Sequence, residues 1–196
     1  MGWTRSVAPE NAPPAVREVY EQIRHRSSAS RVAGYWQALG LDAAGLDTAW
    51  AAHRALRDRA VRPRADGGLG ETGYELLAVA VSATNGCGYC VAHHGPKLAR
   101  ALGDETLARA VARDYRAADL PAHDRVLLDY AVALTCEPSE RTRDDLERMR
   151  EYGFDDRAIV LATEVTAHFN GINRIASALG VELEPGVEAW AFGVPA

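Results

Sequence analysis

Apolar residues recur at intervals of three and four along almost the whole chain, and sustained two-residue alternation is absent. Because a helix has 3.6 residues per turn, this spacing gathers apolar side chains on one face, whereas a half-buried strand needs a period of two. The pattern therefore predicts an all-α protein. With 196 residues, 47% of them hydrophobic and 25% charged, the composition is that of a globular chain large enough for one well-cored domain. We expect a single domain over residues 1–196, with an N-terminal helical extension (1–30) and a C-terminal arm (186–196).

The same spacing, together with proline, glycine and capping residues, divides the chain into segments. Pro63 and three glycines predict a loop over residues 61–72, and Asn85-Gly86 predicts the end of one central helix before the next begins. The tail after residue 180 has no periodicity but carries Val187, Trp190 and Phe192, which would be costly to leave in water. Helices are predicted over 13–26, 46–61, 71–84, 87–102, 104–115, 122–135, 139–153 and 155–179, with Asp104 as a capping residue.

The net charge of −5 is small, and the arginines are scattered among acidic residues instead of forming a stripe. A nucleic-acid partner is therefore not expected. The chain has no run of eighteen apolar residues, and its N-terminus lacks the apolar run of a signal peptide. These features favour a cytoplasmic protein that has no membrane partner.

Two of the three cysteines stand close together in NGCGYCVAHH, residues 85–94. In a reducing compartment, a Cys-x-x-Cys pair points to metal binding or redox catalysis more than to a structural disulfide. Cys87, Cys90 and His94 would supply three metal ligands, whereas a structural zinc site uses four, so we expect no metal and no cofactor; a catalytic zinc with an open position is the remaining metal alternative. Cys136 lies in a helical pattern, and we expect it to be a small buried apolar residue.

The spacing places the two thiols and an imidazole on one side of the second central helix. Cys87 stands near the helix N-terminus, where unpaired N–H groups and the helix dipole lower a thiol pKa. Cys90 and His94 follow at intervals of three and four and share that face. His93 points about 100° away, so we expect a packing or surface role for it.

Glu75 is a charged residue placed just before the apolar run LLAVAVSA. It stands ten residues before Asn85, and His94 stands nine after it, so in an antiparallel helix pair each lies ~14–15 Å from the turn. The two side chains are therefore predicted to meet. A carboxylate orients an imidazole and raises its basicity, and the imidazole could then take a proton from the Cys90 thiol, directly or through water.

Glu75, Cys87, Cys90 and His94 resemble the Glu, Cys-x-x-Cys and His signature of the alkylhydroperoxidase D-like proteins, in the carboxymuconolactone decarboxylase superfamily. The resemblance covers roughly residues 30–185 and is closest to the peroxidase-related branch. It implies an all-helical fold, a homotrimer or hexamer, and thiol peroxidase chemistry in which Cys90 attacks the hydroperoxide, Cys87 resolves the sulfenic acid, and Glu75 and His94 relay protons. The expected partners are a small hydroperoxide or disulfide substrate and an unidentified thiol reductant. The chain departs from one pattern of the family at Tyr89, where a histidine can stand.

The two lines of reasoning differ on which thiol attacks. The helix dipole favours Cys87 as the thiolate, whereas the resemblance and the position of His94, one turn from Cys90, favour Cys90 as the nucleophile. Two alternatives to a peroxidase stay open at this point. One is a carboxymuconolactone decarboxylase-like or biosynthetic tailoring enzyme on the same fold. The other is a non-catalytic, redox-responsive assembly protein in which the apolar tail around Trp190 and Phe192 covers a neighbouring subunit.

Overall fold

The computed structural model describes residues 2–26 and 31–193, and within them every regular element is a helix. The prediction of an all-α fold is confirmed. The predicted extension and arm lie partly outside the described residues, at positions 1, 27–30 and 194–196. The α-helices are α1 (Pro14–Arg26), α2 (Gly34–Leu39), α3 (Ala43–Ala60), α4 (Gly70–Thr84), α5 (Gly88–Leu102), α6 (Glu105–Asp114), α7 (Ala122–Cys136), α8 (Arg143–Glu151) and α9 (Asp156–Ala178), with single 3-10 turns at Pro9–Asn11, Arg64–Asp66 and Pro138–Glu140.

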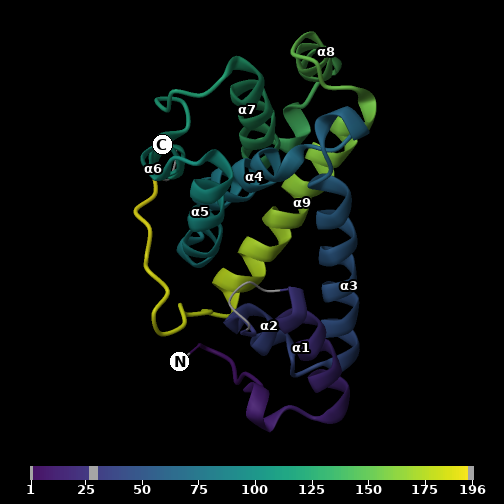
Figure 1. The fold of residues 1–196 in the computed structure, drawn as a ribbon, viewed down its shortest axis with the longest axis vertical. Helices are drawn as coiled ribbons and strands as arrows, with labels where there is room; N and C mark the ends of the chain where they lie inside the picture. The colour runs from purple at the N-terminus through teal and green to yellow at the C-terminus, as the bar shows by residue number, and fades with distance from the viewer. Residues whose placement is uncertain (1, 27–30, 194–196) are drawn as a thin grey trace.

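Helix α4 is the centre of the molecule, and α5, α6, α7 and α9 all pack against it (Figure 1). Its residues from Gly73 to Ala83 are all buried, as its continuous apolar sequence predicts. After α4 the chain turns at Gly86, whose φ of +68° is the left-handed conformation that glycine adopts without strain. Helices α4 and α5 then lie against each other, and Thr72 Oγ1 donates to the carbonyl oxygen of Ala101 at 3.3 Å.

A second apolar cluster forms at the other end of the molecule, where α1 and α2 pack on α3. Helix α9 is 23 residues long, about 35 Å at 1.5 Å per residue, and runs beside α3 so that it joins the two ends (Figure 1). Cys87 and Cys90 belong to the cluster of the N-terminal helices, whereas their neighbour Val91 belongs to the core around α4. The dithiol therefore lies where the two cores meet.

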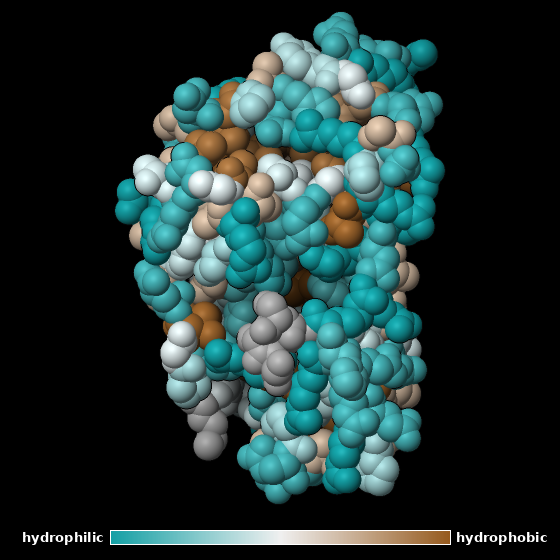
Figure 2. All heavy atoms as spheres, viewed as in Figure 1, coloured by the Kyte–Doolittle hydropathy of each residue, from teal (hydrophilic) through white to brown (hydrophobic). Residues whose placement is uncertain are grey.

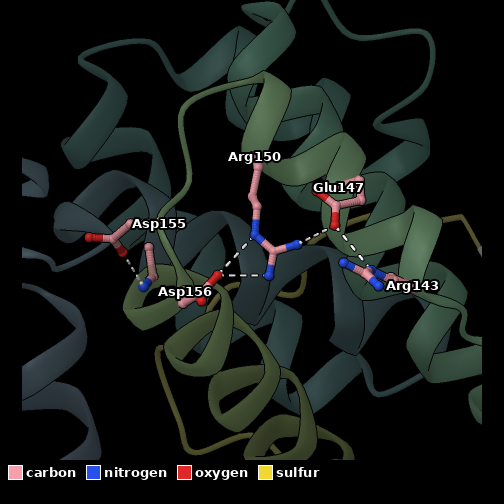
Figure 3. A network of polar contacts seen from close by, with 6 residues as sticks. Arg143, Glu147, Arg150, Asp155 and Asp156 are labelled. Atoms are coloured by element: carbon pink, nitrogen blue, oxygen red, sulfur yellow. Dashed lines mark hydrogen bonds and ion pairs between the residues drawn. The ribbon is translucent and has the colours of Figure 1, made fainter.

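Helix α8 begins at Arg143, four residues later than predicted. Pro138 starts a short 3-10 turn, and Thr142 and Asp145 form a capping box that fixes the true helix start. Figure 3 shows how α8 is tied to the first turn of α9: Arg150 donates to Asp156 at 2.7 and 2.9 Å. These charges are exposed, so their contribution to stability is small.

Cys136 is exposed, which contradicts the expectation that it is buried. It is the last residue of α7, and the buried positions of that helix end at Val132, so the side chain lies beyond the packed face.

The C-terminal segment leaves α9 and returns as an extended strip along the side of α5 and α6 (Figure 1). Trp190 is 5% exposed, fits against Gly95 of α5, and has the Arg109 guanidinium 4.2 Å from its ring centre. Phe192 lies against Gly88. Trp190 is therefore covered by its own chain, whereas Val187 and Phe192 remain half-buried.

Hydrophilic residues cover most of the face seen in Figure 2, and hydrophobic residues gather in its upper half, over the region of α4 and α7. None of the helices in the described ranges is both long enough and apolar enough to cross a membrane.

Candidate active site

The two thiols occupy the start of α5. Cys87 is the residue immediately before the helix and Cys90 is in its first turn; both are unpaired thiols, 2% and 3% exposed. A hydrogen bond from the Cys90 thiol, helped by Ser177 and Asn173, lowers the pKa of Cys87 to about 7 against the opposing effect of burial. The same contact and burial raise the pKa of Cys90, because a charge on Cys90 would stand beside that on Cys87. The resting dithiol therefore carries its first negative charge on Cys87, with Cys90 as the donor.

Glu75 and His94 meet as the spacing predicts: His94 Nδ1 lies 2.7 Å from Glu75 Oε2. Glu75 is fully buried, and burial alone would raise its pKa, but His94 and then Lys97 lower it below the usual value. Burial and Lys97 lower the pKa of His94 to about 4, although Glu75 opposes this shift. At neutral pH the pair is thus a carboxylate and a neutral imidazole. Because a carboxylate only accepts hydrogen bonds, Nδ1 carries the proton and Nε2 is left as the base.

The His94 imidazole and the dithiol lie on the same face of α5. The Cys90 sulfur is hydrogen-bonded to Cys87, Asn173 and Ser82. His94 follows Cys90 by four positions, which is about 6 Å of rise along the helix. A proton passing between them would use a bridging water or the substrate itself. Among the described residues, no three Asp, Glu, His or Cys side chains are grouped to hold a metal ion.

A polar network that the sequence analysis did not find lies behind the sulfurs. Asn173 of α9 and Ser82 of α4 are fully buried, and Asn173 Nδ2 donates to Ser82 Oγ at 2.9 Å. Asn85 Nδ2 donates to Asn173 Oδ1 and to Asn170 Oδ1, both at 3.0 Å. An asparagine on the apolar face of a long helix was the signal available in the sequence, since buried amides are retained only where they are hydrogen-bonded.

Glu184, from the C-terminal segment, forms a second carboxylate–histidine pair beside the dithiol. It accepts hydrogen bonds from Tyr89 Oη at 2.9 Å and from the backbone N–H of Gly34, and its Oε2 lies 2.8 Å from His93 Nε2. Burial would raise its pKa, but the bonds from His93 and Gly34 lower it to about 2. His93 thus has a specific partner, beyond the packing or surface role expected for it. Tyr89 Oη also accepts from the N–H of Tyr35 at 3.1 Å, so its phenol is held from both sides.

Aromatic side chains close the space between α2, α3 and α9. Trp36 makes edge contacts with Trp50 and His53, and His53 Nδ1 lies 3.0 Å from His168 Nε2. Burial, followed by the charges of His168 and His94, lowers the pKa of His53 well below its usual value. His53 is therefore a neutral side chain at physiological pH, in a mostly apolar wall near the relay.

Comparisons with known proteins point to one superfamily and one fold. The sequence profile of the carboxymuconolactone decarboxylase family matches residues 46–114, which contain α4, α5 and all four predicted site residues. The structure is similar to an uncharacterized peroxidase-related protein from Ralstonia eutropha JMP134, described as an alkylhydroperoxidase AhpD core, with a TM-score of 0.83 and 28% identity over 94% of this chain and 93% of that one.

The family profile and the similar structures support the alkylhydroperoxidase D and carboxymuconolactone decarboxylase superfamily for this chain. A second similar structure, that of an uncharacterized peroxidase-related protein from Silicibacter sp. TM1040, has a TM-score of 0.79 and 29% identity over 90% of this chain and 88% of that one. The debrominase Bmp8 shares the fold, with a TM-score of 0.74 and 15% identity over 92% and 91% of the two chains. No curated protein matches the sequence. The superfamily and its fold support a peroxidase-related or other related catalytic role.

Proposed function

We propose that this protein is a thiol-dependent peroxidase, or more broadly a thiol–disulfide oxidoreductase, that reduces hydroperoxides with the Cys87–Cys90 dithiol and the Glu75–His94 proton relay. The observation that carries the proposal is the buried pair of Glu75 and His94, 2.7 Å apart, on the same side of α5 as two unpaired thiols. A lone dithiol needs a separate source of protons for peroxide cleavage, and this arrangement supplies one.

The first half of the reaction breaks the O–O bond. The neutral His94 Nε2 takes the proton of the Cys90 thiol through a water, and the Cys90 thiolate attacks the outer oxygen of the hydroperoxide. Sulfur gains an oxygen and becomes a sulfenic acid, while the RO⁻ group leaves with the bonding electron pair. His94 returns its proton to RO⁻, which departs as the alcohol. Glu75 keeps the imidazole in the required tautomer throughout and stabilises its transient positive charge.

The second half of the reaction forms a disulfide between the two cysteines. The Cys87 thiolate attacks the sulfenic sulfur of Cys90, an S–S bond forms, and hydroxide leaves and takes a proton from solvent to become water. In sum, the Cys87 thiolate, the Cys90 thiol, one hydroperoxide and one proton from solvent give one disulfide, one alcohol and one water. An external dithiol, the proposed partner, then reduces the disulfide by thiol exchange.

The assignment of the attacking sulfur rests on the proton relay, because the resting pKa values favour Cys87 as the thiolate. Thiolate character alone does not complete the reaction, since the leaving RO⁻ group needs an acid close by. His94 is one turn from Cys90 and two from Cys87. We therefore assign attack to Cys90 and resolution to Cys87.

The experiment is a titration of the reduced protein with cumene hydroperoxide and hydrogen peroxide, with the mass of each cysteine followed over time. Cys90→Ser should abolish hydroperoxide consumption, and Cys87→Ser should leave a sulfenic acid at Cys90 that dimedone traps. Cys136→Ser is the matched control, because this exposed thiol lies outside the site, and it should keep full turnover.

Other outcomes would replace the proposal. Unchanged peroxide turnover in Cys90→Ser would remove the peroxidase. Dimedone labelling at Cys87 in Cys90→Ser, with turnover of the first step retained, would reverse the two roles. Full activity of both cysteine variants on a small carboxylate or lactone would favour a decarboxylase-like or tailoring enzyme. No turnover with any substrate, together with a change in subunit number on oxidation, would favour the redox-responsive assembly protein.

We also propose that the protein works as a homo-oligomer, a trimer or a hexamer. On α9, Val160 is 56% and Ile175 39% exposed, and the two lie about 60° apart around the helix. Contact between copies of the chain would remove such apolar surface from water.

A further inference from the structure

Asn173, a residue of α9, reaches both reacting sulfurs at the start of α5. Its amide is 1% exposed and is hydrogen-bonded to Cys87 and to Cys90. Ser177 adds a bond to Cys87, and Ser82 adds one to Cys90. Asn173 is thus the partner that the two thiols have in common.

The surrounding hydrogen bonds decide which end of the amide faces the sulfurs. Asn85 Nδ2 donates to Asn173 Oδ1 at 3.0 Å, so the carbonyl end is already used as an acceptor. Asn173 Nδ2 donates one of its two N–H groups to Ser82 Oγ at 2.9 Å. The network therefore fixes the orientation of the amide, and the second N–H group is the one left for the sulfurs.

Ser82 completes the same arrangement. Its oxygen accepts from Asn173, so its own O–H is left to donate to the sulfur of Cys90. Both groups are donors at the point where they meet the dithiol. Donors stabilise a thiolate and give little to a thiol, and in a buried site such a bond is stronger than in water.

We propose that Asn173, oriented by Asn85 and supported by Ser82, is the hydrogen-bond donor that stabilises the thiolate on whichever of the two sulfurs carries the charge. This inference rests on the proposed dithiol chemistry. Cys87 carries the charge at rest, and Cys90 becomes charged at the moment of attack; one amide within reach of both sulfurs serves each state without a change of structure. The attack on peroxide then needs no reorganisation of the groups around the sulfur.

A matched pair of isosteric substitutions tests the role of Asn173. Asn173→Asp removes the donors beside the sulfurs. Asn170→Asp makes the same change one turn earlier on α9, in a residue that shares the network through Asn85 and Thr135. The readout is the pH dependence of iodoacetamide alkylation of the reduced protein, with the label located on Cys87 or Cys90 by fragment-ion mass spectrometry.

We expect Asn173→Asp to raise the pKa of the lower-titrating thiol by about one unit or more, a tenfold fall in the thiolate-to-thiol ratio near neutral pH. Asn170→Asp should leave that pKa within about 0.3 units of the parent value. The phenols of Tyr35 and Tyr89 also interact electrostatically with Cys90. Burial raises the pKa of both phenols, so they stay neutral through the measured pH range.

An equal shift in the two variants, or no shift in Asn173→Asp, would overturn the proposal. If Asn173→Asp does not fold, as circular dichroism would show, Ser82→Ala carries the test: alkylation at Cys90 should slow about tenfold while that at Cys87 stays the same, and an unchanged Cys90 rate would overturn the proposal. The readout needs no hydroperoxide. Absence of peroxide turnover would therefore remove the proposed function and leave the pKa comparison intact.

Discussion

Gly95 is the position where the C-terminal segment packs most tightly on α5, and Gly95→Ala tests that contact. A Cβ atom added there would lie 2.4 Å from Cε3 and 2.6 Å from Cδ2 of the Trp190 ring. The ring is rigid, buried and covered by Arg109, so the overlap is relieved only by moving the ring or the helix. Overpacking of this kind costs about 1–3 kcal/mol, and alanine's better helix propensity returns about 0.5–1 kcal/mol of it. The two ranges together span about 0–2.5 kcal/mol, and we expect a net loss of about 1–2 kcal/mol of unfolding free energy, in the middle of that span.

Gly171→Ala is the matched control, because Gly171 also lies inside a helix and a Cβ atom there would have no neighbour within 4 Å. It should gain about 0.5–1 kcal/mol from helix propensity alone. In thermal denaturation the two variants should move in opposite directions, Gly95→Ala down by roughly 2–8 °C and Gly171→Ala up by roughly 1–4 °C.

A double-mutant cycle makes the assignment to Trp190 specific. In a Trp190→Ala background the obstructing ring is absent, so Gly95→Ala should no longer destabilise the protein. If Gly95→Ala stabilises the parent protein as much as Gly171→Ala does, or if its cost persists without Trp190, the packing of the tail on α5 is refuted.

Three further predictions concern charge and assembly. Glu75→Gln keeps a hydrogen-bonding group beside His94 but removes the charge, so steady-state peroxide turnover should fall on the order of 10²-fold. Burial lowers the pKa of His94 from 6.5 to about 4, so the unfolded chain binds more protons than the folded protein between those pH values. The unfolding free energy should therefore be highest above pH 6.5 and fall by about 3 kcal/mol as the pH approaches 4. Urea titrations of His94→Gln should show an unfolding free energy that depends less on pH over this range. Light scattering should give the mass of a trimer or hexamer, and Val160→Glu with Ile175→Glu should lower it if α9 forms the contact.

The sequence predicted the helices well where local chemistry determines them. Asp104 and Asp155 accept hydrogen bonds from the first turns of α6 and α9, as their positions at the start of the periodic segments indicate. Helix α2 was missed because six residues are too few to establish a period. The start of α8 was misplaced because propensity extends past Pro138, whereas the capping box at Thr142 decides where the helix begins.

The residues of the candidate site also fall into those that the sequence could predict and those that it could not. Glu75 and His94 could be paired from the sequence because one short turn joins their helices, so distance along the chain converts directly into position. Glu184 lies 90 residues after His94 in a segment without periodicity, and only the tertiary fold brings it to Tyr89 and His93. Asn173 was missed for a related reason, since the crossing of α9 over the start of α5 is not encoded in either helix alone.

The position of Glu184 has a consequence for how the protein is made. A chain emerges from the ribosome N-terminus first, at about 5–20 residues per second, so Glu184 follows Cys90 by 94 residues and roughly 5–20 seconds. During that interval the thiols exist without α9 and without the carboxylate that holds Tyr89 and His93. The nascent chain thus passes through a period in which Cys87 and Cys90 have been synthesised but the segments that bury them have not. A pulse of oxidant during synthesis should therefore damage this protein at lower doses than the same pulse applied to the finished molecule.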